Sequence, residues 1–510
     1  MTRFRSATRS QVIEPANCSG HSKPLTLAAM SLGWGVVQLD VSIVNTALES
    51  IGTSLGGGVS ELQWVVSIYT VAFASLILTT GALGDRLGAK RTFMTGFALF
   101  TVASLTSGLA PTSVILIAAR AVQGVRAAIM VPNSLALLNH AYPGPKARGR
   151  AVGWWLGAGG VALTAGPPVG GALIALAGWR SIFLVNLPIG LAGLWLTWRY
   201  VTDTPRANRK LDLPGQAAAI GALGILAAAL IEGGRLGWSD SRVIAAFGAA
   251  VILAVLFLVH ERRAEEPILP LSLFRRPMFA RTSLIGLLVN IPFYGLIFVF
   301  SLYFQQIDGL SPLRTGLAFV PMMAVILPGN LLAPRLAERF GAPAIIAVGC
   351  LISATGCLAL LGIEPGTSYW ALCGQLVAIG VGIAVPVPPL ASALLGSVEK
   401  SRSGVAASVF NSARQTGSVL GVALFGSLIA QANDFLFGVS AALVVSALLL
   451  VAAAIAIGWR NRGERVEHGD SHLRRRHCVS PRRPRRSRCA NCSKGRDQVT
   501  EMTEQHGLTP

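Results

Sequence analysis

Charged side chains are scarce in this chain. Only 13% of its 510 residues are Asp, Glu, Lys or Arg, whereas 52% are hydrophobic. Soluble globular domains carry about 25% charged residues, so the composition excludes an ordinary soluble protein and indicates a membrane protein. Acidic residues are especially few, which gives a formal net charge of +20. Because the excess cations lie near the two ends and in short loops rather than in one compact domain, we expect no nucleic-acid partner.

Cysteine is also scarce, and the positions of the seven cysteines argue against a disulfide framework. Three of them lie within apolar segments. Cys489 and Cys492 form a Cys-x-x-Cys pair in the Arg-rich segment after residue 460, which could serve as half of a zinc site. A disordered tail with incidental thiols explains the same residues more simply. We therefore expect no metal site and no cofactor.

Motifs for catalysis and nucleotide binding are missing. The chain has no Walker loop, no His-Glu-x-x-His motif and no Gly-x-Ser-x-Gly motif in a strand–turn–helix setting. We therefore expect no enzyme activity. Any transport would have to be driven by an ion gradient, and one charge crossing the membrane potential yields about 2.3 kcal/mol per 100 mV.

Long apolar segments dominate the rest of the sequence. A helix needs about 20 apolar residues to cross the hydrocarbon core of a bilayer, and these segments are too long for the alternating strands of a membrane barrel. Fourteen spans are predicted in total. They lie near residues 25–47, 62–83, 93–110, 113–139, 151–177, 181–200, 215–233, 242–260, 278–303, 314–333, 343–363, 369–395, 404–430 and 436–459.

The distribution of Lys and Arg over the loops supports fourteen spans. Loops after even-numbered spans carry nineteen of these cations, and loops after odd-numbered spans carry four. Because cytoplasmic loops are enriched in Lys and Arg, this pattern places both termini in the cytoplasm. A missed span would move every later loop to the wrong side and destroy the alternation.

An internal repeat indicates two halves. Residues 83–88, Leu-Gly-Asp-Arg-Leu-Gly, recur as residues 336–341, Leu-Ala-Glu-Arg-Phe-Gly, after the second and the tenth span. Parallel repeats of six helices would place the second copy after the eighth span, so two extra helices are predicted between the halves. The predicted organisation is a cytoplasmic arm (1–24), an N-terminal six-helix bundle (25–200), a linker with two helices (211–266), a C-terminal six-helix bundle (276–459) and a basic, disordered cytoplasmic tail (460–510).

Two of the charged residues within predicted spans stand out. Asp40 lies about two-thirds of the way along the first span, and Arg120 lies in the fourth. A charge near the centre of a membrane helix costs roughly 2.5–3.5 kcal/mol and normally faces a cavity or a partner. A carboxylate there can bind or release a proton as its surroundings change, whereas Arg stays charged. An alternative remains open for each residue. Asp40 could lie near the outer end of its helix and bond to the backbone, and the Arg120 side chain could extend to the membrane interface.

The fifth span is rich in glycine and proline. Gly166, Pro167, Pro168, Gly170 and Gly171 fall within six residues. Prolines inside a helix remove amide donors and predict a kink, while glycines allow neighbouring helices to approach closely.

Three of these motifs resemble those of the major facilitator superfamily. The basic loop between the second and third spans resembles the signature loop of that family. Residues 120–126 resemble its fourth-helix motif, which is implicated in proton transfer, although Arg126 stands where a small residue is usual. The fifth span resembles its antiporter motif, which is associated with exporters and generally absent from uptake symporters. The loop residues are Gly81, Asp85, Arg86, Gly88, Lys90 and Arg91.

Further stretches are similar to one branch of that superfamily, the 14-span drug:proton antiporters. They lie at residues 178–190, 304–312 and 411–417. The likeness runs from about residue 25 to 459 and extends to quaternary-ammonium and multidrug exporters. Residues 230–238 resemble the methylenomycin-resistance type of exporter.

The resemblance implies an all-α integral membrane protein with the major facilitator fold, made of two six-helix bundles plus two inserted helices. It implies proton-coupled efflux of drugs, antibiotics or other amphipathic or cationic toxic compounds across the plasma (inner) membrane, by alternating access. The proton gradient would supply the energy. The protein would lie in the lipid bilayer and would function as a monomer.

Residue roles follow from the same resemblance. Asp40 and Arg120 would couple protons to substrate. Asp85 and Arg86 would form a cytoplasmic gate with Glu338 and Arg339 of the second repeat. Independently of the resemblance, a further set of side chains is a candidate lining of the cavity, although the aromatic ones could face the interface or lipid instead. They are those of Trp64, Tyr69, Trp154, Phe293, Tyr294, Asn411 and Arg414.

Two other functions compete with export. One is proton-coupled uptake of a small nutrient, against which the Gly-Pro motif of the fifth span argues. The other is a membrane sensor that transports nothing. Arg126 and the unusual tail are the features that favour it.

Overall fold

The computed structural model describes residues 22–206, 212–264, 267–399, 403–432 and 434–458. All regular secondary structure among these residues is helical, and no β-strand occurs among them. Most of the predicted N-terminal arm and the whole predicted tail, with Cys489 and Cys492, lie outside the described residues.

The first half of the chain supplies the helices of the first six predicted spans. The first span is broken by a short 3-10 helix, and the sixth is broken at Val185. The elements are α1 (Ser22–Ile43), η1 (Val44–Ala47), α2 (Leu48–Leu55), α3 (Val59–Leu87), α4 (Ala89–Gly108), α5 (Ser113–Ala141), α6 (Pro145–Ala177), α7 (Ser181–Leu184) and α8 (Asn186–Tyr200).

The second half supplies the remaining eight predicted spans, several of them in pieces. The tenth span is divided at Phe319 and Val325, and the twelfth at Val385 and Pro386. The elements are α9 (Leu213–Leu236), α10 (Ser241–Arg263), α11 (Leu271–Phe274), α12 (Pro277–Leu302), η2 (Tyr303–Ile307), α13 (Pro312–Ala318), α14 (Val320–Ala324), α15 (Ile326–Phe340), α16 (Ala342–Ala359), α17 (Tyr369–Ala384), α18 (Val387–Gly396), α19 (Ser403–Gln431) and α20 (Phe435–Gly458).

Twelve helical segments of the described chain are long and apolar enough to cross a membrane. The chain is therefore a multi-pass membrane protein. The third and thirteenth predicted spans, α4 and α19, are not among the twelve. α4 begins with Lys90 and Arg91, and α19 carries Asn411, Arg414 and Gln415. Both helices nevertheless pack along others, α4 on α5 and α8, and α19 on α12 and α3.

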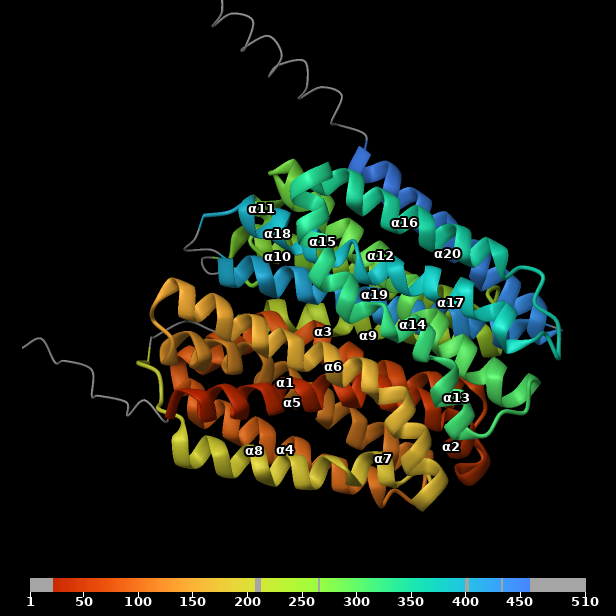
Figure 1. Ribbon diagram of the computed structural model, residues 1–510, viewed down its shortest axis with the longest axis horizontal. Helices are drawn as coiled ribbons and strands as arrows, with labels where there is room; N and C mark the ends of the chain where they lie inside the picture. Colours follow the sequence, from red (N-terminus) through yellow and green to blue (C-terminus); the bar gives the residue numbers. More distant parts are fainter. Residues whose placement is uncertain (1–21, 207–211, 265–266, 400–402, 433, 459–510) are drawn as a thin grey trace, which may run out of the picture. The chain divides into compact units, whose positions relative to one another are not determined.

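The helices fall into two groups that follow the order of the chain. Figure 1 shows α1 to α8, red to yellow, together, and α12 to α20, green to blue, together. The main contacts between the groups are those of α3 with α19 and of α6 with α13. These two seams bring the halves together around the candidate site.

The two inserted helices are packed rather than loosely tethered. α9 contacts both α3 and α19, and α10 packs on α9. The Gln216 side-chain amide donates to the carbonyl oxygen of Ser75 on α3 (2.8 Å), and that of Gln431 on α19 donates to the carbonyl oxygen of Gly233 (3.0 Å). α9 therefore bridges the two halves.

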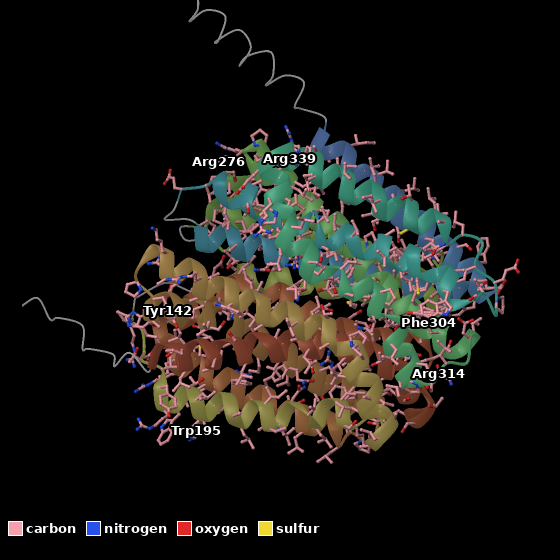
Figure 2. All side chains as sticks on the ribbon, viewed as in Figure 1. Tyr142, Trp195, Arg276, Phe304, Arg314 and Arg339 are labelled. Carbon is pink, nitrogen blue, oxygen red and sulfur yellow. The ribbon has the colours of Figure 1, made fainter. Side chains whose placement is uncertain are left out.

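The internal repeat is visible in the backbone. Gly88 joins α3 to α4 with φ 98° and ψ 126°, and Gly341 joins α15 to α16 with φ 87° and ψ 138°. Glycine adopts such positive φ values without steric cost. In Figure 2, Tyr142, Arg276 and Arg339 lie toward one end of the helices and Arg314 toward the other. This arrangement agrees with the predicted alternation of the loops.

Candidate functional site

Asp40 and Arg120 form a buried ion pair. The Arg120 Nη1 atom on α5 contacts the Asp40 Oδ2 atom on α1, and the two side chains are 1% and 0% exposed. The sequence singled out each residue separately, and the structure brings them together. Because an unpaired charge in a dry interior is strongly unfavourable, each residue explains how the other is tolerated.

Two amides complete the surroundings of the Asp40 carboxylate. Its Oδ1 atom accepts hydrogen bonds from the side-chain amides of Gln123 and Asn186, each at 3.2 Å. Gln123 also accepts from Arg120 at 3.2 Å. Asn186 begins α8 just after the break at Val185. It was not expected as a site residue, although it lies in residues 178–190, a stretch similar to the drug:proton antiporters.

Further contacts hold Arg120 in place. Its Nε atom donates to the carbonyl oxygen of Val65 on α3 (3.2 Å), and its guanidinium carbon lies 4.4 Å from the centroid of the Tyr69 ring. A cation over an aromatic face is stabilised by the ring quadrupole. Arg120 therefore links α1, α3 and α5.

A small cavity lies beside the ion pair, between the two halves. Its volume is about 10 Å³, which is about the space of one water molecule. The cavity does not include Asp40, whereas Arg120 reaches both the cavity and Asp40. The lining residues are Val41, Asn45, Val66, Tyr69, Thr70, Arg120, Tyr294, Ser418 and Val422.

Polar atoms without partners face this region. Tyr69 Oη and Asn45 Oδ1 are buried without a hydrogen-bond partner, although buried polar groups are normally paired. Such atoms are available to bind a substrate or water.

The other residues expected to line the cavity lie elsewhere. Phe293 packs edge-on against Tyr294, with ring centroids 5.1 Å apart, and Trp64 is half-buried. Trp154 on α6 is 72% exposed. None of the three contributes to this cavity among the described residues. Aromatic side chains of membrane proteins often face lipid or the interface, which is why their presence in a span is a weak predictor of cavity lining.

Asn411 and Arg414 are half-buried on α19 and also lie outside the cavity lining. Arg414 lies four residues before Ser418, which places the two on the same helix face. Its Nε atom is buried without a hydrogen-bond partner. Arg414 is therefore a positive charge one helical turn from the cavity.

The Gly-Pro helix packs against both halves. Gly166 and Gly170 of α6 face Ser42 and Thr46 of the first span. A Cβ atom at Gly171 would lie 2.5 Å from the carbonyl oxygen of Pro312, which begins α13 of the other half.

Gly316 on α13 makes the reciprocal contact, against the carbonyl oxygen of Pro167. Nothing in the sequence distinguishes Gly316 from the other glycines. α6 continues as one helix through Pro167 and Pro168. The α6–α13 seam is thus a backbone-to-backbone contact that only residues without a side chain allow.

Residues 81–91, predicted as a loop, form the last turns of α3, a tight turn at Gly88 and the first turn of α4, because glycine lets two helix ends meet directly. They are anchored to α8 and to the segment that follows it. The Asp203 carboxylate accepts from the Lys90 amide (2.9 Å) and lies beside Gly88, while the Lys90 ammonium group donates to the carbonyl oxygen of Trp198 (3.1 Å). Arg86 and Arg91 are exposed.

Other members of the two repeats are placed as follows. Gly81 lies against α5, near Pro132. Glu338 is exposed, and the exposed Arg339 lies over the ring of its neighbour Phe340, 5.2 Å from the centroid. A gate formed by Asp85, Arg86, Glu338 and Arg339 remains a prediction.

Comparison with known proteins identifies the relatives of this chain. Residues 30–422 match the model of the Major Facilitator Superfamily. The chain is 35% identical to the methylenomycin A resistance protein of Streptomyces coelicolor, over 85% of this chain and 91% of that protein. It is 36% identical to the multidrug resistance protein Stp of Mycobacterium tuberculosis, over 80% of this chain and 76% of that protein.

Solved structures with the same fold are more distant in sequence. A bacterial homologue of the human lysosomal transporter Spinster, crystallised inward-facing and unoccupied, aligns with a TM-score of 0.61 at 18% identity, over 86% of this chain and 97% of that chain. The human organic anion transporter MFSD10 aligns with a TM-score of 0.59 at 17% identity, over 87% of this chain and 100% of that chain. With a family model that matches most of its length, the chain belongs to the Major Facilitator Superfamily.

Proposed function

We propose that this protein exports drugs or other amphipathic small molecules across the plasma membrane in exchange for protons. The observation that carries the proposal is the buried Asp40–Arg120 pair, in which Arg120 also lines the cavity between the halves. Relatives named for methylenomycin A resistance and multidrug resistance support export. The proton gradient would be the energy source, with no cofactor and no enzyme activity. A single chain holds the pair and the cavity, so we propose a functional monomer.

The proposed topology has fourteen spans and cytoplasmic termini. The nineteen-to-four distribution of loop cations supports it. So does the packing of α4 and α19 along other helices of their bundles, despite their lower hydropathy. In this topology the α6–α13 seam closes the extracellular side, and the loops around Asp85 and Glu338 lie on the cytoplasmic side.

Protonation of Asp40 is the proposed coupling step. The ionised carboxylate pairs with Arg120, and a proton that binds it neutralises the charge and weakens the pair. The Arg120 guanidinium then adds an uncompensated positive charge beside the cavity. A cationic substrate would bind less tightly to that state, so proton binding and substrate release favour each other.

Alternating access would follow from changes at the seams between the halves. The cavity is too small for a drug in this conformation, so the substrate must enter through a cytoplasmic opening and leave through an extracellular one. Opening outward requires the α6–α13 seam to separate. We propose that Asp85, Arg86, Glu338 and Arg339 close the cytoplasmic side at that stage.

Transport by inside-out vesicles tests the direction. With an acidic lumen and a clamped membrane potential, radiolabelled tetraphenylphosphonium, an amphipathic cation, is expected to accumulate in the lumen. Accumulation that instead requires a more acidic outer solution would indicate an uptake symporter. If neither gradient drives uptake of this cation or of any compound in a drug panel, the chain is a sensor rather than a transporter.

Replacement of Arg414 by Gln should shift the charge preference of the substrate. Because Arg414 lies one turn from Ser418 of the cavity, its charge disfavours cations there. At an effective dielectric constant of about 20, a charge several ångströms away is worth about 2 kcal/mol. We expect export of tetraphenylphosphonium to rise by about tenfold or more relative to that of chloramphenicol, which is neutral. Equal changes for both compounds would contradict this role.

A further inference from the structure

A chain of buried polar side chains leads from Asp40 away from the cavity, toward the extracellular ends of α4 and α8. We propose that extracellular protons reach Asp40 along this chain, inside the N-terminal bundle, rather than through the substrate cavity. The inference rests on the proposed function, because it specifies how the proton of the exchange enters.

The first branch of the chain runs through Gln123. The Ser107 hydroxyl lies within donating distance of Gln123 Oε1 (3.2 Å) and of the carbonyl oxygen of Ala103 in its own helix (3.0 Å), and Gln123 Nε2 donates to Asp40 Oδ1 at 3.2 Å. Ser107 is the last residue but one of α4, which ends at Gly108. With a rise of 1.5 Å per residue, its hydroxyl lies within one turn of the helix end. The branch therefore connects Asp40 to the outer end of α4.

The second branch runs through Asn186. Its Nδ2 atom donates to Asp40 Oδ1 at 3.2 Å and to Ser104 Oγ at 3.0 Å, and Ser104 donates to the carbonyl oxygen of Phe183 at 2.9 Å. Phe183 belongs to α7, beside the break that precedes α8. The Asn186 Oδ1 atom is buried without a hydrogen-bond partner. An unpaired acceptor next to Asp40 is a position at which an entering proton carrier can bind.

These polar groups are costly where they lie. Ser104, Ser107, Gln123 and Asn186 are all 0% exposed, in a membrane interior where polar groups must find partners within the protein. None of the four lines the cavity between the halves. α4 packs on α5, α7 and α8, on the side of the N-terminal bundle that lies away from the C-terminal helices in Figure 1. The proton path and the substrate cavity are thus separate.

Arg120 is shared by the proton path and the substrate cavity. It contacts Asp40 and Gln123 on the side of the chain, and it lines the cavity on the other. The charged and titratable groups that face Asp40 are Arg120 from α5 and Tyr69 from α3.

The transfer balances as a single proton movement. A hydronium ion at the outer end gives up a proton. Water molecules bound at the serine hydroxyls and at the free Asn186 Oδ1 acceptor pass a proton on in turn, and the Asp40 carboxylate becomes a neutral carboxyl group. Gln123 and Asn186 are positioning residues, since their amides orient the carboxylate. Proton and substrate then influence each other through Arg120 without occupying the same space.

The test separates proton delivery from substrate movement. The double variant Ser104→Ala/Ser107→Ala removes both hydroxyls. Ser446→Ala is the matched control, because Ser446 is equally buried and bonds only to its own helix, at the carbonyl oxygen of Ala442 (2.7 Å). Inside-out vesicles are assayed for two rates with radiolabelled tetraphenylphosphonium: uptake driven by an acidic lumen, and exchange of labelled for unlabelled compound at equal pH.

We expect the double variant to lose proton-driven uptake by at least about tenfold while exchange stays at the wild-type rate. We also expect its uptake rate to saturate at a more acidic lumen pH. Equal loss of both rates would show a merely structural role and overturn the proposal, as would unchanged proton-driven uptake. If wild-type protein exchanges the compound but shows no proton-driven uptake, the proposed function itself fails, which is a distinct outcome.

A cysteine variant gives an independent readout. Ser107→Cys, treated from the luminal side with a membrane-impermeant methanethiosulfonate, should lose proton-driven uptake while exchange continues. The wild-type protein, which keeps its own cysteines, receives the same treatment as control. Modification that stops exchange and uptake together, or an introduced thiol that no luminal reagent reaches, would overturn an extracellular entry at this position.

Discussion

Replacement of Asp40 by Asn is expected to abolish proton-driven export while the chain still inserts into the membrane. Asn keeps the size and hydrogen-bonding capacity of the side chain but cannot bind and release a proton near neutral pH. The variant also leaves Arg120 buried beside a neutral partner. Removing one member of a buried ion pair costs about 3–5 kcal/mol, so abundance in the membrane must be measured together with drug susceptibility.

Two further variants separate lost coupling from lost stability. Asp40→Asn/Arg120→Gln removes both charges and should recover membrane abundance without recovering export. Glu364→Gln makes the same chemical change at an exposed loop residue and should behave as wild type. Drug resistance that survives in Asp40→Asn at normal abundance would count decisively against the coupling role of this carboxylate.

Replacement of Gly171 by Val is expected to remove export by a different route. At this position even a Cβ atom would lie 2.5 Å from the Pro312 carbonyl oxygen and 2.8 Å from the Leu313 Cα atom. These are backbone atoms and cannot move aside as a flexible side chain would. The α6–α13 seam therefore cannot close, and the protein should remain biased toward the outward-open state. We expect the export rate to fall by at least about tenfold.

A matched control lies on the same helix. Gly160 of α6 has no atom within 4 Å of its hypothetical Cβ, so Gly160→Val tests the effect of a β-branched residue in α6 without a clash. Accessibility of a cysteine placed near Pro312 to an extracellular reagent reports the state of the seam. If Gly171→Val exports at the wild-type rate, or if Gly160→Val loses as much of its export rate, then Gly171 is not needed for closure of this seam.

Much of the fold could be predicted from the sequence because the membrane limits the alternatives. Every predicted span corresponds to a helix or to a broken set of helices, since apolar segments of this length have few other structures in lipid. The repeat at residues 83–88 and 336–341 reappears as two turns with matching backbone at Gly88 and Gly341. The breaks at Val185, Phe319 and Val385 were not predicted, because hydropathy does not respond to local interruptions of a helix.

The candidate site could be predicted only in part. Asp40 and Arg120 stand out because a charge in an apolar span is costly, but their pairing depends on how α1 and α5 pack. Gln123 lies in the fourth-helix motif and Asn186 in the stretch 178–190, but their contact with Asp40 depends on the fold. Gly316 is one glycine among 56 until α13 meets α6. Trp154 was expected to line the cavity but is exposed, since an aromatic residue in a span can face outward as readily as inward.

Proton movement that accompanies substrate movement is the most direct test of the account. Inside-out vesicles with an acidic, buffered lumen and a clamped membrane potential are given tetraphenylphosphonium, and the outer pH and luminal substrate are recorded together. We predict that the cation enters the lumen while protons leave it, and that the Asp40→Asn variant shows neither flux. Substrate accumulation without proton release, or substrate and protons moving in the same direction, would contradict it.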